Sequence, residues 1–158
     1  MRSVIPQHCP TALHHLCASV LLAMFLAGCS IKLVSDYDSA SIDQLLGTYQ
    51  EVDQFYDRLA ETPSEQRTYE AFQQDWSSIS TDLRTFALRQ GVRQLNEESA
   101  SIAEALTKAW ERERTLHKGR SADPGQRNDP YPDTRIALDR QQFEDWFYAA
   151  MFAEKSKK

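Results

Sequence analysis

Residues 69–86 read YEAFQQDWSSISTDLRTF, and the spacing of the apolar side chains in this stretch decides the fold. These side chains recur alternately three and four positions apart, as in the seam of a coiled coil. They are Tyr69, Phe72, Trp76, Ile79, Leu83 and Phe86. Most of them are aromatic, which suits the broad core of a helical bundle better than a slender dimer. The stretch therefore predicts an amphipathic helix packed against other helices.

The segment before this stretch has the same helical periodicity, over about five turns. Its apolar residues are Ile42, Leu45, Leu46, Tyr49, Val52, Phe55, Tyr56 and Leu59. We expect this helix to begin near Ser35 or Asp36, because Ser35 and Asp38 have the spacing of a capping box. Acidic side chains at its start would also complement the helix dipole.

A capping sequence separates these two segments. Thr62 has the position of an N-cap, Pro63 fits the first helical position, and Glu65 completes a second capping box. Because all three signals agree, we expect a turn at this point and a new helix starting immediately after Thr62.

A third helical segment follows a second break in the pattern. The apolar spacing stops at Gly91 and a helical pattern restarts at Asn96, so we expect a break or kink between about Arg89 and Asn96. The apolar residues of the third segment are Ile102, Leu106, Ala109, Trp110 and Leu116. The charged run at 111–114 is expected to face water.

Residues 118–133 are rich in proline and glycine and nearly free of apolar side chains, which predicts a long loop, either functional or mobile. Asp133 is then expected to cap a last helix that ends in a basic tail. The apolar residues of that helix are Ile136, Leu138, Phe143, Trp146, Phe147, Ala150 and Met151.

These segments predict an all-α protein, an antiparallel helical bundle of four segments spanning residues 35–158. The chain has 158 residues, of which 41% are hydrophobic and 26% charged, as in a globular protein. No segment alternates with period two over a useful length, so strands are not expected. The alternative is a three-helix body with a loosely docked last helix.

The amino-terminal part of the chain has a different character. Residues 16–27 form an apolar run of twelve residues without formal charge. Such a run is too short to cross a membrane as a helix, but it has the length of the apolar region of a signal peptide. The segment before the run is unusual for a signal peptide, because Arg2 is its only basic residue. A start codon further upstream is therefore an alternative.

The apolar run ends in Leu26-Ala27-Gly28-Cys29, which resembles the lipobox of bacterial lipoproteins. The resemblance implies that lipoprotein signal peptidase recognises Leu26, Ala27 and Gly28 and cleaves before Cys29, which carries a diacylglycerol thioether. Residues 1–28 are then a signal peptide and residues 29–34 a lipidated tether. In the sorting pattern of such lipoproteins, Asp at the position after the cysteine retains the protein in the inner membrane. Ser30 occupies that position here, so the same resemblance implies the periplasmic face of the outer membrane.

Cleavage before Cys29 would change the chemistry of the chain. Cys9 and Cys17 would leave with the signal peptide, so the mature chain could form no internal disulfide. Loss of Arg2 leaves 17 basic against 23 acidic residues, a net charge of −6 that argues against nucleic-acid binding. His117 would be the only histidine left, which excludes a histidine-rich metal site.

A weaker resemblance covers about residues 31–158. The opening IKLVSDYD at 31–38, with the helix at 69–86, the restart at Asn96, the pair Leu116-His117 and the basic last helix, is similar to a group of small uncharacterised proteobacterial lipoproteins. The resemblance implies a long first helix after the opening motif. It implies no activity, because the group has none established.

Few residues suggest chemistry. Asp36, Tyr37 and Asp38 could form a site for a cation or a partner, or they could cap the first helix. We favour capping, because no glycine-centred loop supplies the further oxygens that a cation site needs. His117 is expected to be a surface group near a helix C-terminus rather than a base. A di-iron bundle needs Glu-x-x-His on two helices. Glu113 precedes His117 by four positions and the chain has no second copy of the motif, so a di-iron site is not expected.

The other polar and aromatic candidates have structural explanations that we favour. The pair Asp53 and Asp57 has the spacing of a solvated helix face. The acidic residues of the long loop are expected to form turns rather than a weak calcium site. The three tryptophans are expected in the core, although they would also suit the lining of a ligand pocket. The acidic loop residues are Asp123, Asp129 and Asp133, and the tryptophans are Trp76, Trp110 and Trp146.

Two hypotheses of function follow. The first is a non-enzymatic interaction or structural module, lipid-anchored in the cell envelope, that contacts a protein partner through an apolar patch on the last helix or the 118–133 loop. The alternative is a periplasmic carrier that binds a small apolar ligand inside the bundle. We expect no enzymatic activity, cofactor or metal, because no set of nucleophile, base and oxyanion donor can be assembled from these residues.

Overall fold

The computed structural model describes residues 33–126 and 128–158. The predicted signal peptide and residues 29–32 of the tether lie outside these described residues. The described chain consists of helices joined by short connections and contains no strand. The elements are α2 (Ser39–Glu61), η1, a short 3-10 turn (Ser64–Gln66), α3 (Gln73–Gly91), α4 (Glu97–Ala122) and α5 (Asp133–Lys155). The predicted all-α class is therefore confirmed.

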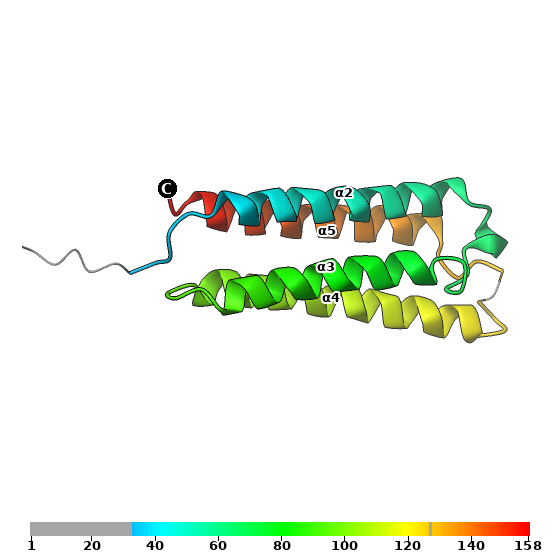
Figure 1. Ribbon diagram of the computed structural model, residues 1–158. Coiled ribbons are helices and arrows are strands. Elements are labelled where there is room, and N and C mark those ends of the chain that lie inside the picture. The colour runs from blue at the N-terminus through cyan, green and yellow to red at the C-terminus, as the bar shows by residue number, and fades with distance from the viewer. Residues whose placement is uncertain (1–32, 127) are drawn as a thin grey trace, which may run out of the picture. The chain divides into compact units, whose positions relative to one another are not determined.

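The helices form an antiparallel four-helix bundle (Figure 1). Both α2 and α4 pack against α3 and against α5, so each helix has two neighbours. The last helix is thus part of the body, and the alternative of a loosely docked last helix is wrong. We call the end formed by residues 33–38, 92–96 and 152–158 the proximal end, and the end formed by residues 62–72 and 123–132 the distal end.

The core is aromatic. Every member of the seam in residues 69–86 is buried, as its spacing predicted. Phe55 lies at the centre, with its ring edge-on to Trp76 at 4.6 Å and to Trp110 at 5.3 Å between ring centroids. Trp76 and Trp110 are fully buried, and Trp146 is partly buried beside them. Trp76 and Trp110 are therefore core residues, as expected, and Trp146 lies at the edge of the core.

The first helix begins later than predicted. Asp38, not Ser35 or Asp36, is the N-cap of α2, and its carboxylate accepts a hydrogen bond from the amide of Ala40 at 3.1 Å. Ser35 does not cap, because its hydroxyl donates to the side chain of Asn96 at 2.7 Å. The capping box was thus wrong, since a partner 61 positions away competes for Ser35.

The second helix also begins later than its capping sequence predicted. The residues after Thr62 form only η1, and α3 starts at Gln73. Thr62 does not cap a helix, because its hydroxyl donates to the carbonyl of Arg58. Arg67 is buried and donates to the carbonyls of Ala60 and Thr62, so its guanidinium holds the connection folded against the bundle.

The break between α3 and α4 lies where it was predicted. Helix α3 ends at Gly91, α4 begins at Glu97, and Leu95 between them has a φ of 55°, in the left-handed region.

The long loop is shorter than predicted. Helix α4 continues to Ala122, so the connection covers only residues 123–132. Asp133 is the first residue of α5 rather than its cap, and its carboxylate instead accepts from the Arg67 guanidinium at 2.6 Å. Arg67 also donates to the carbonyl of Tyr131, which is fully buried. One buried arginine thus joins the two connections of the distal end.

Candidate functional site

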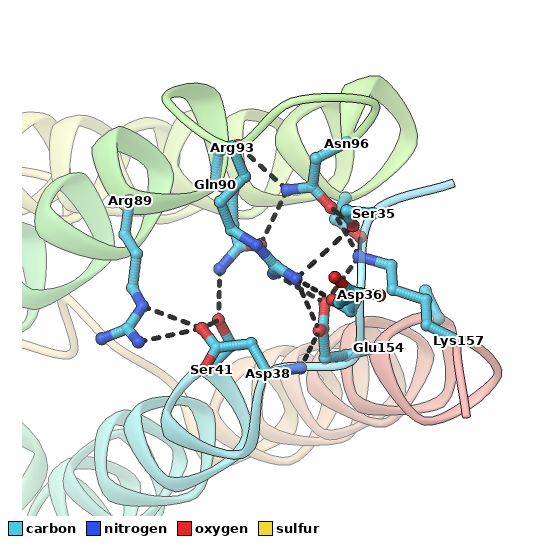
Figure 2. A network of polar contacts seen from close by, with 12 residues as sticks. Ser35, Asp36, Asp38, Ser41, Arg89, Gln90, Arg93, Asn96, Glu154 and Lys157 are labelled. Carbon is cyan, nitrogen blue, oxygen red and sulfur yellow. Dashed lines mark hydrogen bonds and ion pairs between the residues drawn. The ribbon is translucent and has the colours of Figure 1, made fainter. Parts of the chain in front are cut away.

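The densest polar cluster lies at the proximal end, where five segments of the chain meet (Figure 2). It joins residues 35–38, the first turn of α2, the end of α3, the 92–96 connection and the end of α5. We call it the proximal network. Its members are Ser35, Asp36, Asp38, Ser41, Arg89, Gln90, Arg93, Asn96, Glu154 and Lys157.

Glu154 is the central acceptor of the proximal network, with a side chain only 3% exposed. Its carboxylate accepts from Arg93 at 3.1 Å, from Lys157 at 2.6 Å and from the backbone amide of Asp38 at 2.8 Å. Burial raises the pKa of Glu154, but the hydrogen bonds from Arg93, Lys157 and Asp38 outweigh it, so the pKa is below its usual value. Glu154 is therefore ionised at neutral pH.

Asp38 is the second acceptor. Its carboxylate accepts from the Arg89 guanidinium at 2.8 Å and from the Ser41 hydroxyl at 2.8 Å, in addition to the amide of Ala40. Burial raises the pKa of Asp38, but the hydrogen bonds and the charge of Arg89 together outweigh burial. The pKa of Asp38 is therefore below its usual value. These contacts confirm the capping role of Asp38 and occupy the oxygens that a cation site would need.

The amides of the network connect its two acceptors. Gln90 donates to the Ser41 hydroxyl at 2.8 Å, and Asn96 donates to the Gln90 side chain at 2.9 Å. The guanidinium of Arg93 also donates to the backbone carbonyl of Asp36. The proximal network thus clamps residues 35–38 onto the helices, and its donors and acceptors are matched within the protein.

His117 lies near the distal end and is fully buried, so the expected surface position was wrong. Its Nδ1 accepts from the indole of Trp76 at 2.9 Å, and its Nε2 donates to the carbonyl of Arg67 at 2.8 Å. Burial lowers the pKa of His117 to about 4, against a smaller raising effect of the bond to Arg67. The imidazole is therefore neutral and structural, with both nitrogens engaged.

A buried ionic cluster lies between α4 and α5. Glu113 was predicted to face water, but it is buried. Its carboxylate accepts a hydrogen bond from Arg135 at 2.6 Å. Asp139 accepts from Arg135 at 2.8 Å and from the Tyr131 hydroxyl at 2.7 Å. Burial raises the pKa of Asp139 above its usual value. Within the described protein, the second Asp139 oxygen and the Tyr56 hydroxyl have no hydrogen-bond partner.

The remaining acidic candidates do not converge on a metal site. Asp53 and Asp57 both pair with Arg140, at 2.6 and 2.7 Å, and so connect α2 to α5 instead of facing only water. Asp123 accepts from the amide of Gly125 in a tight turn, as predicted for the loop. Within residues 33–126 and 128–158, no three His, Cys, Asp or Glu side chains lie together as metal ligands would.

The outer surface offers two grooves along α5. One, of about 530 Å³, lies between α4 and α5 and is lined by Arg112, Glu113 and the partly buried Trp146. The other, of about 570 Å³, lies between α2 and α5 beside Arg140. Helix α5 also exposes Leu138, Tyr148 and Phe152, whereas no large apolar side chain described in the 123–132 connection is exposed. The described part of the connection therefore offers no exposed apolar side chain for the predicted patch, whereas the last helix offers three.

The predicted lipidation site, Cys29, and its neighbours Leu26, Ala27, Gly28 and Ser30 lie outside the described residues. Among the helices that are described, none is long and apolar enough to cross a membrane.

The chain matches no family model, no characterised protein and no solved structure in the comparisons made. The fold and the proximal network therefore define its class by themselves: the described residues form an all-α, antiparallel four-helix bundle with residues 35–38 clamped to one end.

Proposed function

We propose that the protein is a lipid-anchored module of the bacterial cell envelope, held through Cys29 at the periplasmic face of the outer membrane, which presents its bundle to a protein partner without catalysing a reaction. The observation that carries this proposal is the proximal network. It clamps the chain at residues 35–38, directly after the predicted tether, to the ends of the helices.

The short distance along the chain supports this proposal. Ser35, the first clamped residue, is six positions after Cys29. A fully extended chain covers about 3.3–3.6 Å per residue, so the tether would span at most about 20 Å. A diacylglycerol on Cys29 would therefore keep the proximal end close to the lipid headgroups and the bundle at a raised effective concentration beside envelope proteins.

The interior favours an interaction module over the alternative of a carrier. The aromatic rings that would line a ligand cavity contact one another, with Trp76 and Trp110 only 4.3 Å apart between centroids. A void beside Phe86 and Glu154 measures about 10 Å³, room for about one water molecule. The proximal network consists of paired charges and hydrogen-bonded amides, which support a structural role.

Lipidation is tested by replacing the acylated side chain. In cells given radiolabelled palmitate, the wild-type protein should incorporate label, and the Cys29→Ser variant should incorporate none, because serine forms no thioether. The variant should also leave the membrane fraction or accumulate with its signal peptide uncleaved. Equal labelling of both proteins would contradict the proposal.

The partner is tested with a photo-crosslinking residue in place of Tyr148, whose side chain is 69% exposed on α5. In intact cells this position should capture one dominant envelope protein. The matched control replaces Glu104, which is exposed on α4 and paired only with Lys108, and should capture it weakly or not at all. Failure to capture a protein at Tyr148 in several growth conditions would count against the interaction module.

A further inference from the structure

Large apolar side chains are exposed mainly at the proximal end. Six of the ten that the described chain exposes lie within about one helical turn of that end, and each is between 45% and 80% exposed. They come from the tether, the end of α3, the 92–96 connection and the end of α5. The six residues are Leu33, Val34, Leu88, Val92, Leu95 and Phe152.

The distal end exposes fewer such side chains; the nearest are Leu116 and Leu138, more than one turn inside their helices. Its two connections, 62–72 and 123–132, expose no large apolar side chain among the residues described, and Tyr69, Phe72 and Tyr131 are buried there. Scattered apolar side chains are normal on a protein surface, but their concentration at one end of a bundle marks a contact surface. A surface that contacts only water does not account for this asymmetry.

We propose that the proximal end lies on the surface of a phospholipid bilayer, with these six side chains in the interfacial region. The inference rests on the proposed lipid anchor. Leu33 is only four positions after Cys29, a reach of at most about 14 Å. A diacylglycerol on Cys29 therefore brings the exposed side chains to the headgroups, where Leu, Val and Phe partition favourably.

The proximal network makes these side chains act together. It fixes residues 35–38, Arg93 of the 92–96 connection and the end of α5 to one another through Glu154 (Figure 2). The apolar side chains on or next to those segments are therefore held together at the same end of the bundle. No single one of them needs to bind the membrane strongly, because the anchor already holds the surface beside it.

The charges at this end indicate which lipids it needs. Arg89 and Arg93 are neutralised by Asp38 and Glu154 inside the network. Lys155, Lys157 and Lys158 lie at the same end as Asp36, Glu97 and Glu98, so acidic and basic side chains balance. Apolar contact, rather than attraction to anionic lipid, therefore supplies the interaction, and a zwitterionic bilayer is sufficient.

The test uses the full chain, processed in bacterial cells and reconstituted into phosphatidylcholine vesicles. Once Cys29 is acylated, a cysteine introduced at Val92 is the only free thiol, and it can carry an environment-sensitive fluorophore. The matched control is Leu138→Cys. Val92 is 73% exposed at the proximal end and Leu138 is 59% exposed near the distal start of α5, so neither substitution disturbs the core.

Brominated phosphatidylcholine should quench the label at position 92 at least threefold more than the label at 138, with little effect of salt. Equal quenching, in vesicles that the protein still floats with, would overturn the membrane contact and leave the anchor intact. Failure to float would overturn the anchor and the contact together. If the label at 92 stays unquenched in vesicles, while a photo-crosslinking residue at the same position captures a protein in cells, this surface belongs to a protein partner instead.

Discussion

Acidification from pH 7 to pH 4 should lower the free energy of unfolding by about 3 kcal/mol through His117 alone. The fold holds the pKa of this imidazole at about 4, against 6.5 for an unperturbed histidine. Between these values the unfolded chain binds a proton that the native protein does not. The stabilisation is therefore complete above the unfolded pKa and is lost as the pH falls towards 4.

The cause of this sensitivity is burial, which outweighs the weak effect of the negative charge of Glu70. Protonation would put a charge on a fully buried ring and turn Nδ1, which accepts from Trp76, into a second donor facing a donor. Burial is the largest influence on the pKa of His117; the bond to Arg67 opposes it, and the positive charge of Arg120 adds to it. The structure therefore resists protonation until it opens.

The measurement is simplified because His117 would be the only imidazole in the processed chain. Its NMR signals should show a proton on Nε2 and should not titrate between pH 7 and about 5. The control is His117→Gln, whose loss of stability on acidification should be smaller than that of the wild type by about 3 kcal/mol. An imidazole that titrates above pH 6, or equal acid losses in both proteins, would contradict the prediction.

Other titrating groups do not affect this comparison, since both proteins contain them. The lowered pKa values of Asp38 and Glu154 remove stability as the pH falls through those values. The raised pKa values of Glu51 and Asp139 have the opposite effect on stability. Protonation removes a charge that is poorly solvated in the native protein, so these groups add stability as the pH falls. The difference between wild type and variant therefore isolates His117.

Periodicity predicted the helices well because it is a local property. The seam at 69–86 identified the core side of its segment, and Gly91 marked a real break. The starts of α2 and α3 were wrong, because Ser35 and Thr62 satisfied capping rules yet form hydrogen bonds with Asn96 and Arg58 instead. A capping rule does not include competitors from elsewhere in the fold.

The buried polar residues were missed although the sequence held a signal for them. In α4, Glu113 and His117 continue the spacing of Leu106 and Trp110, so they occupy seam positions. In α5, Asp139 and Glu154 likewise fall on its buried stripe, which otherwise consists of Ile136, Phe143, Phe147 and Ala150. A polar residue on a seam indicates burial with a partner, but only the fold identifies Trp76 or Arg93 as that partner.

The second large effect concerns the proximal network. Replacing Glu154 by alanine should lower the free energy of unfolding by about 3 kcal/mol. The substitution removes the acceptor of Arg93, Lys157 and the Asp38 amide at once, and the side chains of Arg93 and Lys157 are only 17% and 10% exposed. Two cations left together without their carboxylate also repel each other.

Chemical denaturation measures this loss, and Glu104→Ala is its matched control. Glu104 is also a helical glutamate paired with a lysine, Lys108, but both side chains are exposed, so its removal should cost no more than about 0.5 kcal/mol. Glu154→Gln, which keeps an acceptor oxygen without the charge, should lose less than the alanine variant. Similar losses for Glu154→Ala and Glu104→Ala would mean that the network adds no stability.

Loss of the network should also release the segment that follows the tether, which links stability to the proposed function. The amide of Asp38 donates to Glu154, and the amide of Ser35 donates to the carbonyl of Leu95. In Glu154→Ala the Asp38 amide should exchange hydrogen almost as fast as an open chain, while amides in the middle of α3 stay protected. If instead the Asp38 amide keeps its protection, residues 35–38 are held by their other contacts, such as the bonds from Ser35 to Leu95 and Asn96, and the proximal end would keep its orientation without the carboxylate of Glu154.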